Sequence, residues 1–254
     1  PVVVLKQIFQ HSPLVFLSLK SSGITRPEQM VDKKVMFKPE EDAPLLAMLL
    51  ETLGSLEKIK TVPFTFDHED LVAGKVDVMS AYITSEPFYF EQQHIPINII
   101  NPQNYGIDFY GDNLFTTEEE IRKHPERVQK MIRATLKGWE YALNHPIEII
   151  DLITNEYNSK LSHEQLIYEA QMTHQMILPM VTPLGTVTPQ RYGQIARDYE
   201  SVGMAELPVD LCAFIYQCPE YGKHSSGLSL TPEERAWIDK HPVVRARIGN
   251  APPL

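Results

Sequence analysis

Residues 76–90 contain the side chains whose types and spacing best suit binding chemistry. An apolar run ends there in Tyr82, Thr84 and Glu86, which offer an aromatic ring, a hydroxyl and a carboxylate. Pro87 follows at a position that suits the first turn of a helix. Open α/β sheets place ligands where a strand ends in polar groups at a helix start. We therefore predict a binding site at this bend, with an ordinary helix cap as the alternative for Thr84 and Ser85.

A second group of polar residues precedes an apolar helix expected over residues 43–53. Glu40, Glu41 and Asp42 stand together at its start. Helix N-termini attract anions, but three carboxylates there would repel a sulfonate or phosphate and would suit an amine or an aminopyrimidine. Capping of the helix is the other interpretation. Glu41 and Asp42 are therefore candidate contacts for a positively polarised ligand.

The sequence contains no recognisable catalytic or metal-binding motif. The histidines lack His-x-x-x-His spacing, and neither a Gly-x-Ser-x-Gly sequence nor a phosphate-binding loop occurs. Cys212 and Cys218 are too few for a zinc site and form either one local disulfide or two buried thiols. We therefore expect no metal, no cofactor and no catalysis.

Two kinds of apolar pattern divide the chain. Up to residue 100, strands alternate with helices, which predicts a mostly parallel sheet covered on both faces. The expected strands cover residues 2–8, 14–19, 34–37, 59–64, 76–81 and 97–100, and the expected helices 43–53 and 67–73. Caps and prolines then predict helices that begin near residues 117, 125, 146, 162, 189 and 210. The C-terminal half is therefore expected to be helical.

Composition and charge limit the partners. The 254 residues carry a formal net charge of −10, which argues against nucleic acid as a ligand. No apolar run approaches the length of a membrane span, so membrane contact is expected only through segments outside this sequence. The chain starts in an apolar strand without an initiator methionine or a signal sequence, which indicates an internal piece of a longer protein.

Four stretches together resemble a known family. They are VVVLKQIFQHSP (2–13), SAYITSEP (80–87), YGIDFYGD (105–112) and GWEYA (138–142). Through them residues 2–217 resemble the NMT/THI-type domains, which are related to binding and synthesis of the thiamine pyrimidine precursor. The resemblance implies an α/β fold of the type II periplasmic-binding-protein kind, with two lobes and a ligand cleft between them.

The resemblance also implies domain bounds. Residues 14–103 would form lobe two, 1–13 and 104–217 a partial lobe one, 218–230 a linker, and 231–254 the start of a further solute-binding-like domain. The N-terminal part of lobe one would be missing. Homodimer formation stays open, because unpaired strand edges invite a partner.

Further candidate ligand contacts follow from the crossovers between the two lobes, which line the cleft in such folds. Gln10 and His11 stand on the first crossover, and Asp108 and Tyr110 on the return crossover. For His11 a hydrogen bond within a turn is the alternative, and for Tyr110 a place in the core.

The resemblance leads to one function and two alternatives. The tail resembles the junctions found in periplasmic sensing regions of membrane-anchored bacterial histidine kinases and diguanylate cyclases. We therefore expect an extracytoplasmic sensor module that binds a small nitrogenous ligand, such as a pyrimidine. The first alternative is the solute-binding component of an ABC transporter for thiamine precursors. The second is a pyrimidine-synthase-like enzyme, which the absence of a cysteine-rich stretch disfavours.

Overall fold

The computed structural model describes residues 1–65, 67–157, 160–218 and 236. Residues Pro1–Gln217 form one compact unit, and it is this unit that carries the features below. The linker expected over 218–230 and the further domain expected over 231–254 lie outside the described residues, apart from Cys218 and Ala236. Within the described residues, no helix combines the length and the apolar character needed to cross a membrane.

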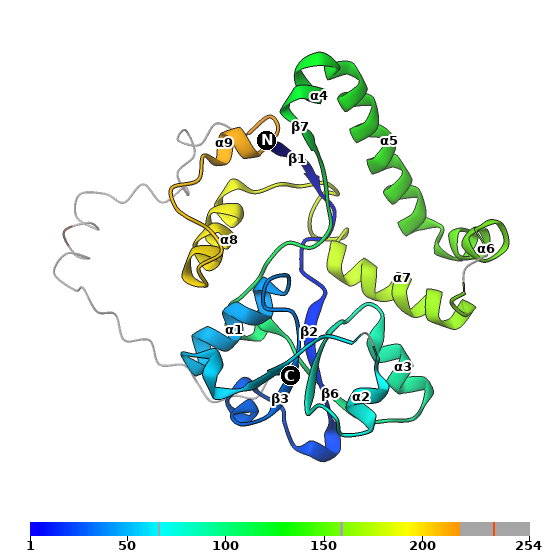
Figure 1. Ribbon diagram of the computed structural model, residues 1–254. Coiled ribbons are helices and arrows are strands. Elements are labelled where there is room, and N and C mark those ends of the chain that lie inside the picture. The colour runs from blue at the N-terminus through cyan, green and yellow to red at the C-terminus, as the bar shows by residue number, and fades with distance from the viewer. Residues whose placement is uncertain (66, 158–159, 219–235, 237–254) are drawn as a thin grey trace. The chain divides into compact units, whose positions relative to one another are not determined.

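A five-stranded sheet is built from the first hundred residues (Figure 1). Its order is β4 (Lys60–Val62), β3 (Lys34–Met36), β5 (Val78–Tyr82), β2 (Leu14–Leu19) and β6 (Ile97–Ile100). β3 pairs in parallel with β4 and β5, whereas β2 pairs antiparallel with β5 and β6. Four strands, β3, β4, β5 and β6, therefore run in the same direction, as a mostly parallel sheet predicts, and the expectation is wrong for β2 alone. β2 brings the chain into the sheet and β6 takes it out, so these two strands run in opposite directions.

Helices cover both faces of this sheet. They are α1 (Ala43–Leu53), α2 (Glu69–Val72) and α3 (Glu86–Gln92). Successive side chains of a strand point to opposite faces, so Phe16 and Val78 pack with α1, whereas Leu17 and Met79 pack with α2 and α3. Because both faces are apolar and buried, the sheet is a firm support for the residues at its strand ends.

The rest of the unit is a two-stranded ribbon with helices around it. β1 (Val2–Gln7) pairs antiparallel with β7 (Asn113–Thr117), so the parallel pairing expected for the first strand is wrong. The helices are α4 (Glu118–Lys123), α5 (Pro125–Asn144), α6 (Pro146–Glu156), α7 (His163–Ile177), α8 (Pro189–Ser201) and α9 (Leu211–Phe214). Short 3-10 helices cover Lys20–Ser22, Pro27–Met30, Leu56–Lys58 and Pro102–Tyr105. Leu5 of β1 packs with Val128 and Ile132 of α5, which fixes that helix on the ribbon.

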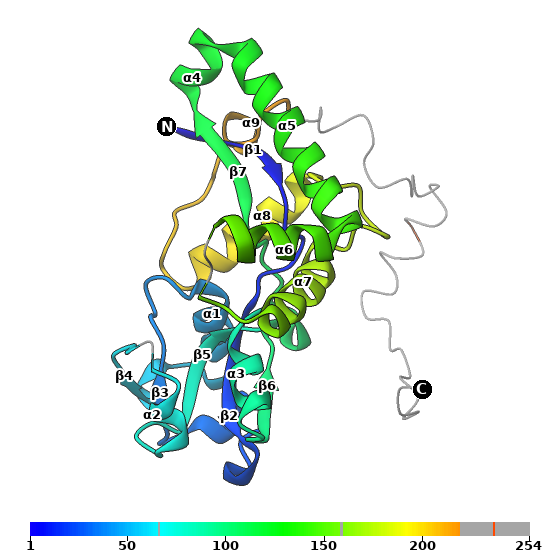
Figure 2. The same ribbon diagram turned by 90° about the vertical axis from the view of Figure 1, so that its right-hand side faces the viewer.

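Two crossovers, residues 8–13 and 101–112, connect the ribbon to the sheet (Figures 1 and 2). They run side by side: the Ser12 N–H donates to the Phe109 carbonyl at 2.8 Å, and the Gly111 N–H donates to the Phe9 carbonyl at 3.2 Å. A Cβ atom on Gly111 would lie 2.9 Å from the His11 carbonyl oxygen, so a glycine is needed at this close approach. The division into lobes at residues 14–103 stays a prediction.

Candidate functional site

Tyr82 ends β5 with a side chain that is 51% exposed. It shares a face of the strand with Ser80, two residues earlier. The Ser80 side chain lies near the carboxylate of Asp42, the N-cap residue of α1, and lowers the pKa of that carboxylate against the larger effect of burial. Asp42 is buried, and it also accepts a hydrogen bond from the Lys38 backbone N–H at 3.0 Å. Two residues predicted from separate stretches are therefore brought together at one strand end.

Four carboxylates lie close enough to the Tyr82 hydroxyl for their charges to act on it. Partial burial raises the pKa of Tyr82, and the charges of Asp112, Asp42, Glu86 and Glu41 raise it further, in that order. Burial also raises the pKa of both Asp42 and Asp112. A ligand that donates hydrogen bonds or carries positive charge would relieve the cost of these charges. We call these five side chains the Tyr82 site.

The remaining residues of the bend have specific contacts. The Glu86 carboxylate accepts a hydrogen bond from the Tyr82 backbone N–H at 2.7 Å. Glu41 pairs with the Lys38 ammonium at 2.8 Å. Thr84 lies half-buried in the turn before α3, where Ser85 occupies the N-cap position and no side chain caps the helix. The helix-cap alternative is therefore wrong for Thr84, whereas Ser85 takes the N-cap position without a capping hydrogen bond from its side chain.

Asp112 joins the Tyr82 site from the return crossover, and our sequence analysis missed it. Its carbonyl oxygen accepts three hydrogen bonds, from the N–H groups of Ile8 and Phe9 at 2.9 and 3.0 Å and from Gln7 Nε2 at 2.9 Å. Gln7 is fully buried. The only sequence signal was that Asp112 closes the YGIDFYGD stretch, two residues after Tyr110.

Asp108 and Tyr110 take part in a different arrangement. The Asp108 carboxylate lies 2.7 Å from His11 Nδ1 and 2.7 Å from the Arg191 guanidinium of α8. The same guanidinium lies over the Tyr110 ring, 4.3 Å from its centre. Burial, the largest influence, favours the neutral acid, but His11 and Arg191 outweigh it and hold the pKa of Asp108 below its usual value. Arg191 was also missed, because nothing near it in sequence points to the crossovers.

Other polar side chains of the crossovers also form hydrogen bonds within the protein. Buried Gln10 donates from Nε2 to the Thr186 carbonyl at 3.2 Å. Gln103 donates to the Asp108 carboxylate at 3.0 Å. Ligand contact by Gln10, His11, Asp108 or Tyr110 stays a prediction, whereas Gln10 contacts Thr186 and the other three contact one another or Arg191 of α8.

Two cavities lie away from Tyr82. One, of about 910 Å³, lies among α5, α6 and α7, and the other, of about 410 Å³, lies between the ribbon and α8 and includes Tyr110. Neither is lined by Tyr82, Asp42 or Glu86, so convergence of side chains, rather than enclosed volume, defines the Tyr82 site. Among the described residues, no group of three or more His, Cys, Asp or Glu side chains is placed to hold a metal ion. Both Cys212 and Cys218 are disulfide-bonded.

Two known proteins are similar to this chain in sequence. Formylaminopyrimidine-binding protein of Halalkalibacterium halodurans is 26% identical over 164 residues, which are 63% of this chain and 48% of that protein. Riboflavin-binding protein RibY of Chloroflexus aurantiacus is 22% identical over 221 residues, 83% of this chain and 62% of that protein. The chain thus spans about half to three fifths of the length of these two relatives.

The fold has solved counterparts. The periplasmic aliphatic sulphonate binding protein SsuA from Escherichia coli aligns with a TM-score of 0.65 at 13% identity, over 93% of this chain and 76% of that one. This likeness shows the fold alone: an α/β fold of the periplasmic-binding-protein kind. The sequence profile of the family described as NMT1/THI5 like matches residues 1–149, more than half of the chain. The resemblance stated from the sequence is thereby confirmed, and the chain belongs to the NMT1/THI5 like family.

Proposed function

We propose that this chain is the ligand-binding module of an extracytoplasmic receptor, and that it holds a small nitrogenous ligand at the Tyr82 site. The observation that carries the proposal is the convergence of an exposed tyrosine ring with Asp42, at the start of α1, and Asp112, on the return crossover. The ring offers a stacking face for a flat heterocycle. The carboxylates accept hydrogen bonds from amino groups on its edge.

The charge of the site favours this ligand class over an anion. Four carboxylates lie close enough to the Tyr82 hydroxyl to raise its pKa, and the Lys38 ammonium, which lies beside one of them, is paired with Glu41. A sulfonate would be repelled at such a site. The two relatives are named for a formylaminopyrimidine and for riboflavin, and both compounds contain nitrogen heterocycles.

A place outside the cytoplasm is supported by two observations. The chain belongs to a family whose solved counterparts in fold include periplasmic binding proteins. Its two cysteines are disulfide-bonded, and such bonds persist mainly in oxidising compartments. Binding, and not catalysis, is the activity proposed.

The signalling role is the finer part of the proposal. It rests on residues 231–254, whose sequence resembles the entry to a further solute-binding domain, as in membrane-anchored sensor proteins. Closing of two lobes on a ligand would shift an equilibrium between open and closed forms, and the following domain would pass that shift on. The competing role is the solute-binding component of a transporter. The reading frame around this segment decides between them: a membrane span followed by a kinase or cyclase supports the sensor, and an adjacent permease gene contradicts it.

Isothermal titration calorimetry of the 254-residue chain tests the ligand class. We expect binding heat with 4-aminopyrimidine derivatives or with riboflavin, and none with an alkanesulfonate. Asp42→Asn and Asp112→Asn should each weaken binding about tenfold or more, because a hydrogen bond to a charged group contributes about 1.5–3 kcal/mol. Glu51→Gln, at the exposed far end of α1, is the matched control and should bind normally. Absence of heat from every nitrogen compound would refute the proposal.

A further inference from the structure

The residue directly after Tyr82 is bonded to two distant segments of the chain. The Ile83 N–H donates to the Pro13 carbonyl of the first crossover at 2.8 Å. The Ile83 carbonyl accepts a hydrogen bond from the Tyr168 hydroxyl of α7 at 2.9 Å. Both backbone polar groups of Ile83 are therefore used to attach the bend to the rest of the unit.

Side chains add to the contact between α7 and the bend. The Tyr168 ring lies against Phe88 of α3, with ring centres 5.6 Å apart. The Ile83 side chain packs both with the core of the sheet and with an apolar cluster formed by the first crossover and α7. Ser85 Oγ lies 3.5 Å from the Glu169 carboxylate. α7 thus holds the bend through a hydrogen bond, a ring contact and apolar packing.

The Tyr168 hydroxyl is a lasting hydrogen-bond donor. Burial, with smaller contributions from the charges of Glu91 and Glu86, raises the pKa of Tyr168 to about 12. The hydroxyl therefore keeps its proton at neutral pH. Without it, the Ile83 carbonyl would lose its donor at a half-buried position, and an unpaired polar group there is costly.

The other end of α7 is bonded to the first crossover. The Met176 carbonyl accepts hydrogen bonds from the N–H groups of Gln10 and His11 at 2.8 and 3.2 Å. Tyr168 and Met176 are eight residues apart in α7, which is about 12 Å along a helix axis. A single helix therefore keeps the bend and the crossover at a set distance.

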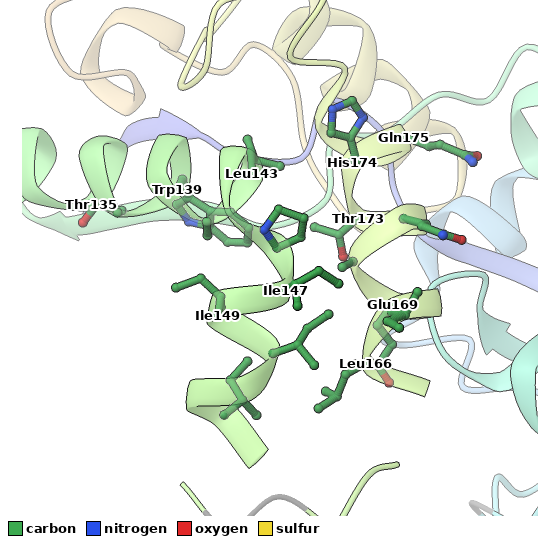
Figure 3. A pocket seen from close by; sticks show the side chains of 18 residues that line it. Thr135, Trp139, Leu143, Ile147, Ile149, Leu166, Glu169, Thr173, His174 and Gln175 are labelled. Atoms are coloured by element: carbon green, nitrogen blue, oxygen red, sulfur yellow. The ribbon is translucent and has the colours of Figure 1, made fainter. Parts of the chain in front are cut away.

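α7 is itself supported by α5. Trp139 and Leu143 of α5 pack against the apolar cluster that includes Ile177, the last residue of α7. Figure 3 shows both side chains and, on α7, Leu166 and Thr173, which line the cavity of about 910 Å³ among α5, α6 and α7. Because α5 packs on the ribbon, α7 carries the position of the ribbon to the bend.

We propose that Tyr168 is a positioning residue for the Tyr82 site, an inference that rests on the proposed function of that site. Asp112 lies on the return crossover, which runs beside the first crossover. Tyr82 lies one residue before the carbonyl that Tyr168 holds. Since α7 is bonded to the bend and to the first crossover, the Tyr168 hydroxyl helps to set how far the Tyr82 ring stands from the Asp112 carboxylate.

Amide hydrogen exchange of Tyr168→Phe, measured by NMR on the 254-residue chain without ligand, tests whether the hydroxyl holds the bend. The phenylalanine keeps the ring beside Phe88 and removes only the hydroxyl. We expect the Tyr82 and Ile83 amides to exchange about three- to tenfold faster than in wild type, because one hydrogen bond is lost. The amides of β3, inside the sheet, should exchange at the wild-type rate.

Calorimetry with 4-aminopyrimidine and with riboflavin tests the effect on binding. Tyr168→Phe should weaken the binding of whichever compound wild type binds by about three- to tenfold. Tyr168→Leu also loses the ring contact and should weaken it further. Tyr141→Phe is the matched control for both measurements: it loses a hydroxyl that donates to Glu148 at 2.8 Å, and it should behave as wild type.

Three results would overturn the inference. They are unchanged exchange at the bend in Tyr168→Phe, an equal rise in exchange at the bend and in β3, and faster exchange at the bend with unchanged ligand affinity. The second result would show that the hydroxyl stabilises the fold in general. If wild type binds no nitrogen compound, the proposed function fails, and the exchange measurement by itself decides whether Tyr168 fixes Tyr82.

Discussion

At the scale of single residues, Asp108 shows how one carboxylate can join distant segments of the chain. The sequence places it on a crossover, where a ligand contact is expected, and the structure surrounds it with His11, Arg191 and Gln103 at 2.7, 2.7 and 3.0 Å. The Arg191 guanidinium also covers Tyr110. These contacts join both crossovers to α8. Asp42 and Asp112 differ, because burial raises the pKa of each and neither faces a salt-bridge partner among the described ion pairs.

Replacing Asp108 by asparagine should destabilise the protein by about 1–2 kcal/mol, since it removes charge-assisted contacts at a carboxylate that is only partly exposed. Urea unfolding measures the loss. Because the folded-state pKa of Asp108 is lowered, its contribution is present above the usual aspartate value of about 3.9 and disappears as the pH falls through the lowered pKa. The difference between wild type and variant should therefore persist at pH 5 and narrow below about pH 4.

The exposed pair of His163 and Asp151, 3.2 Å apart, is the matched control. Asp151→Asn should cost less than about 0.5 kcal/mol, because exposed ion pairs contribute little. Equal losses for the two variants would mean that Asp108 has no special role in joining the crossovers.

At the scale of helices, local signals set most of the boundaries. The N-cap hydroxyls of Thr117 and Ser162 accept hydrogen bonds from the N–H groups of Glu120 and Gln165 at 3.1 Å each. α1 ends at Gly54 in a left-handed conformation with φ of 77°. These features depend on neighbours within four residues, so the helices begin and end close to where the sequence predicts them.

Two glycines give a direct test of helix energetics. A Cβ atom on Gly138, inside α5, or on Gly54, after α1, would have no heavy atom within 4 Å. Gly138→Ala should raise the free energy of unfolding by about 0.5–1 kcal/mol, because alanine loses less backbone entropy in a helix. Gly54→Ala should lower it by about 1 kcal/mol, since φ there is positive. Thermal unfolding followed by circular dichroism measures both, and changes of the same sign would contradict this account.

At the scale of the whole unit, the proposed binding at the Tyr82 site depends on two crossovers that run side by side. The Tyr82 site needs Asp112 from one part of the chain beside Tyr82 and Asp42 from another, and the crossovers set that distance. Gln7 helps to fix it by donating to the carbonyls of Gly111 and Asp112 at 2.9 Å each.

Gly111→Ala should disturb this arrangement. The new Cβ atom would lie 2.9 Å from both the His11 carbonyl oxygen and the Phe9 Cβ, so the crossovers must move apart. We expect a loss of about 1–3 kcal/mol in stability, together with weaker binding of the aminopyrimidine in calorimetry. Gly193→Ala in α8, where the nearest atom would be 3.4 Å away, is the control: it should not lower the stability and should leave ligand binding unchanged. Normal ligand binding by Gly111→Ala would show that the crossover spacing does not control the Tyr82 site.

The sequence by itself determined the features that depend on neighbouring residues. Caps, prolines and glycines predicted the helix bounds, and the spacing of apolar residues predicted the strands. The stretches around Tyr82 and Asp108 led to the family, and the acids at the start of α1 indicated the charge of the Tyr82 site. All of these signals lie within a few residues of the feature they predict, where local conformational preferences act.

Only the tertiary structure decided which of those residues meet. It made β2 run antiparallel to its two neighbours in the sheet, β5 and β6. It brought Asp112 near Tyr82 and placed Arg191 of α8 against Asp108. It also left an apolar groove among helices whose sequences each look ordinary. Such contacts join residues far apart in the chain, and their energies depend on packing and burial, which no short stretch of sequence contains.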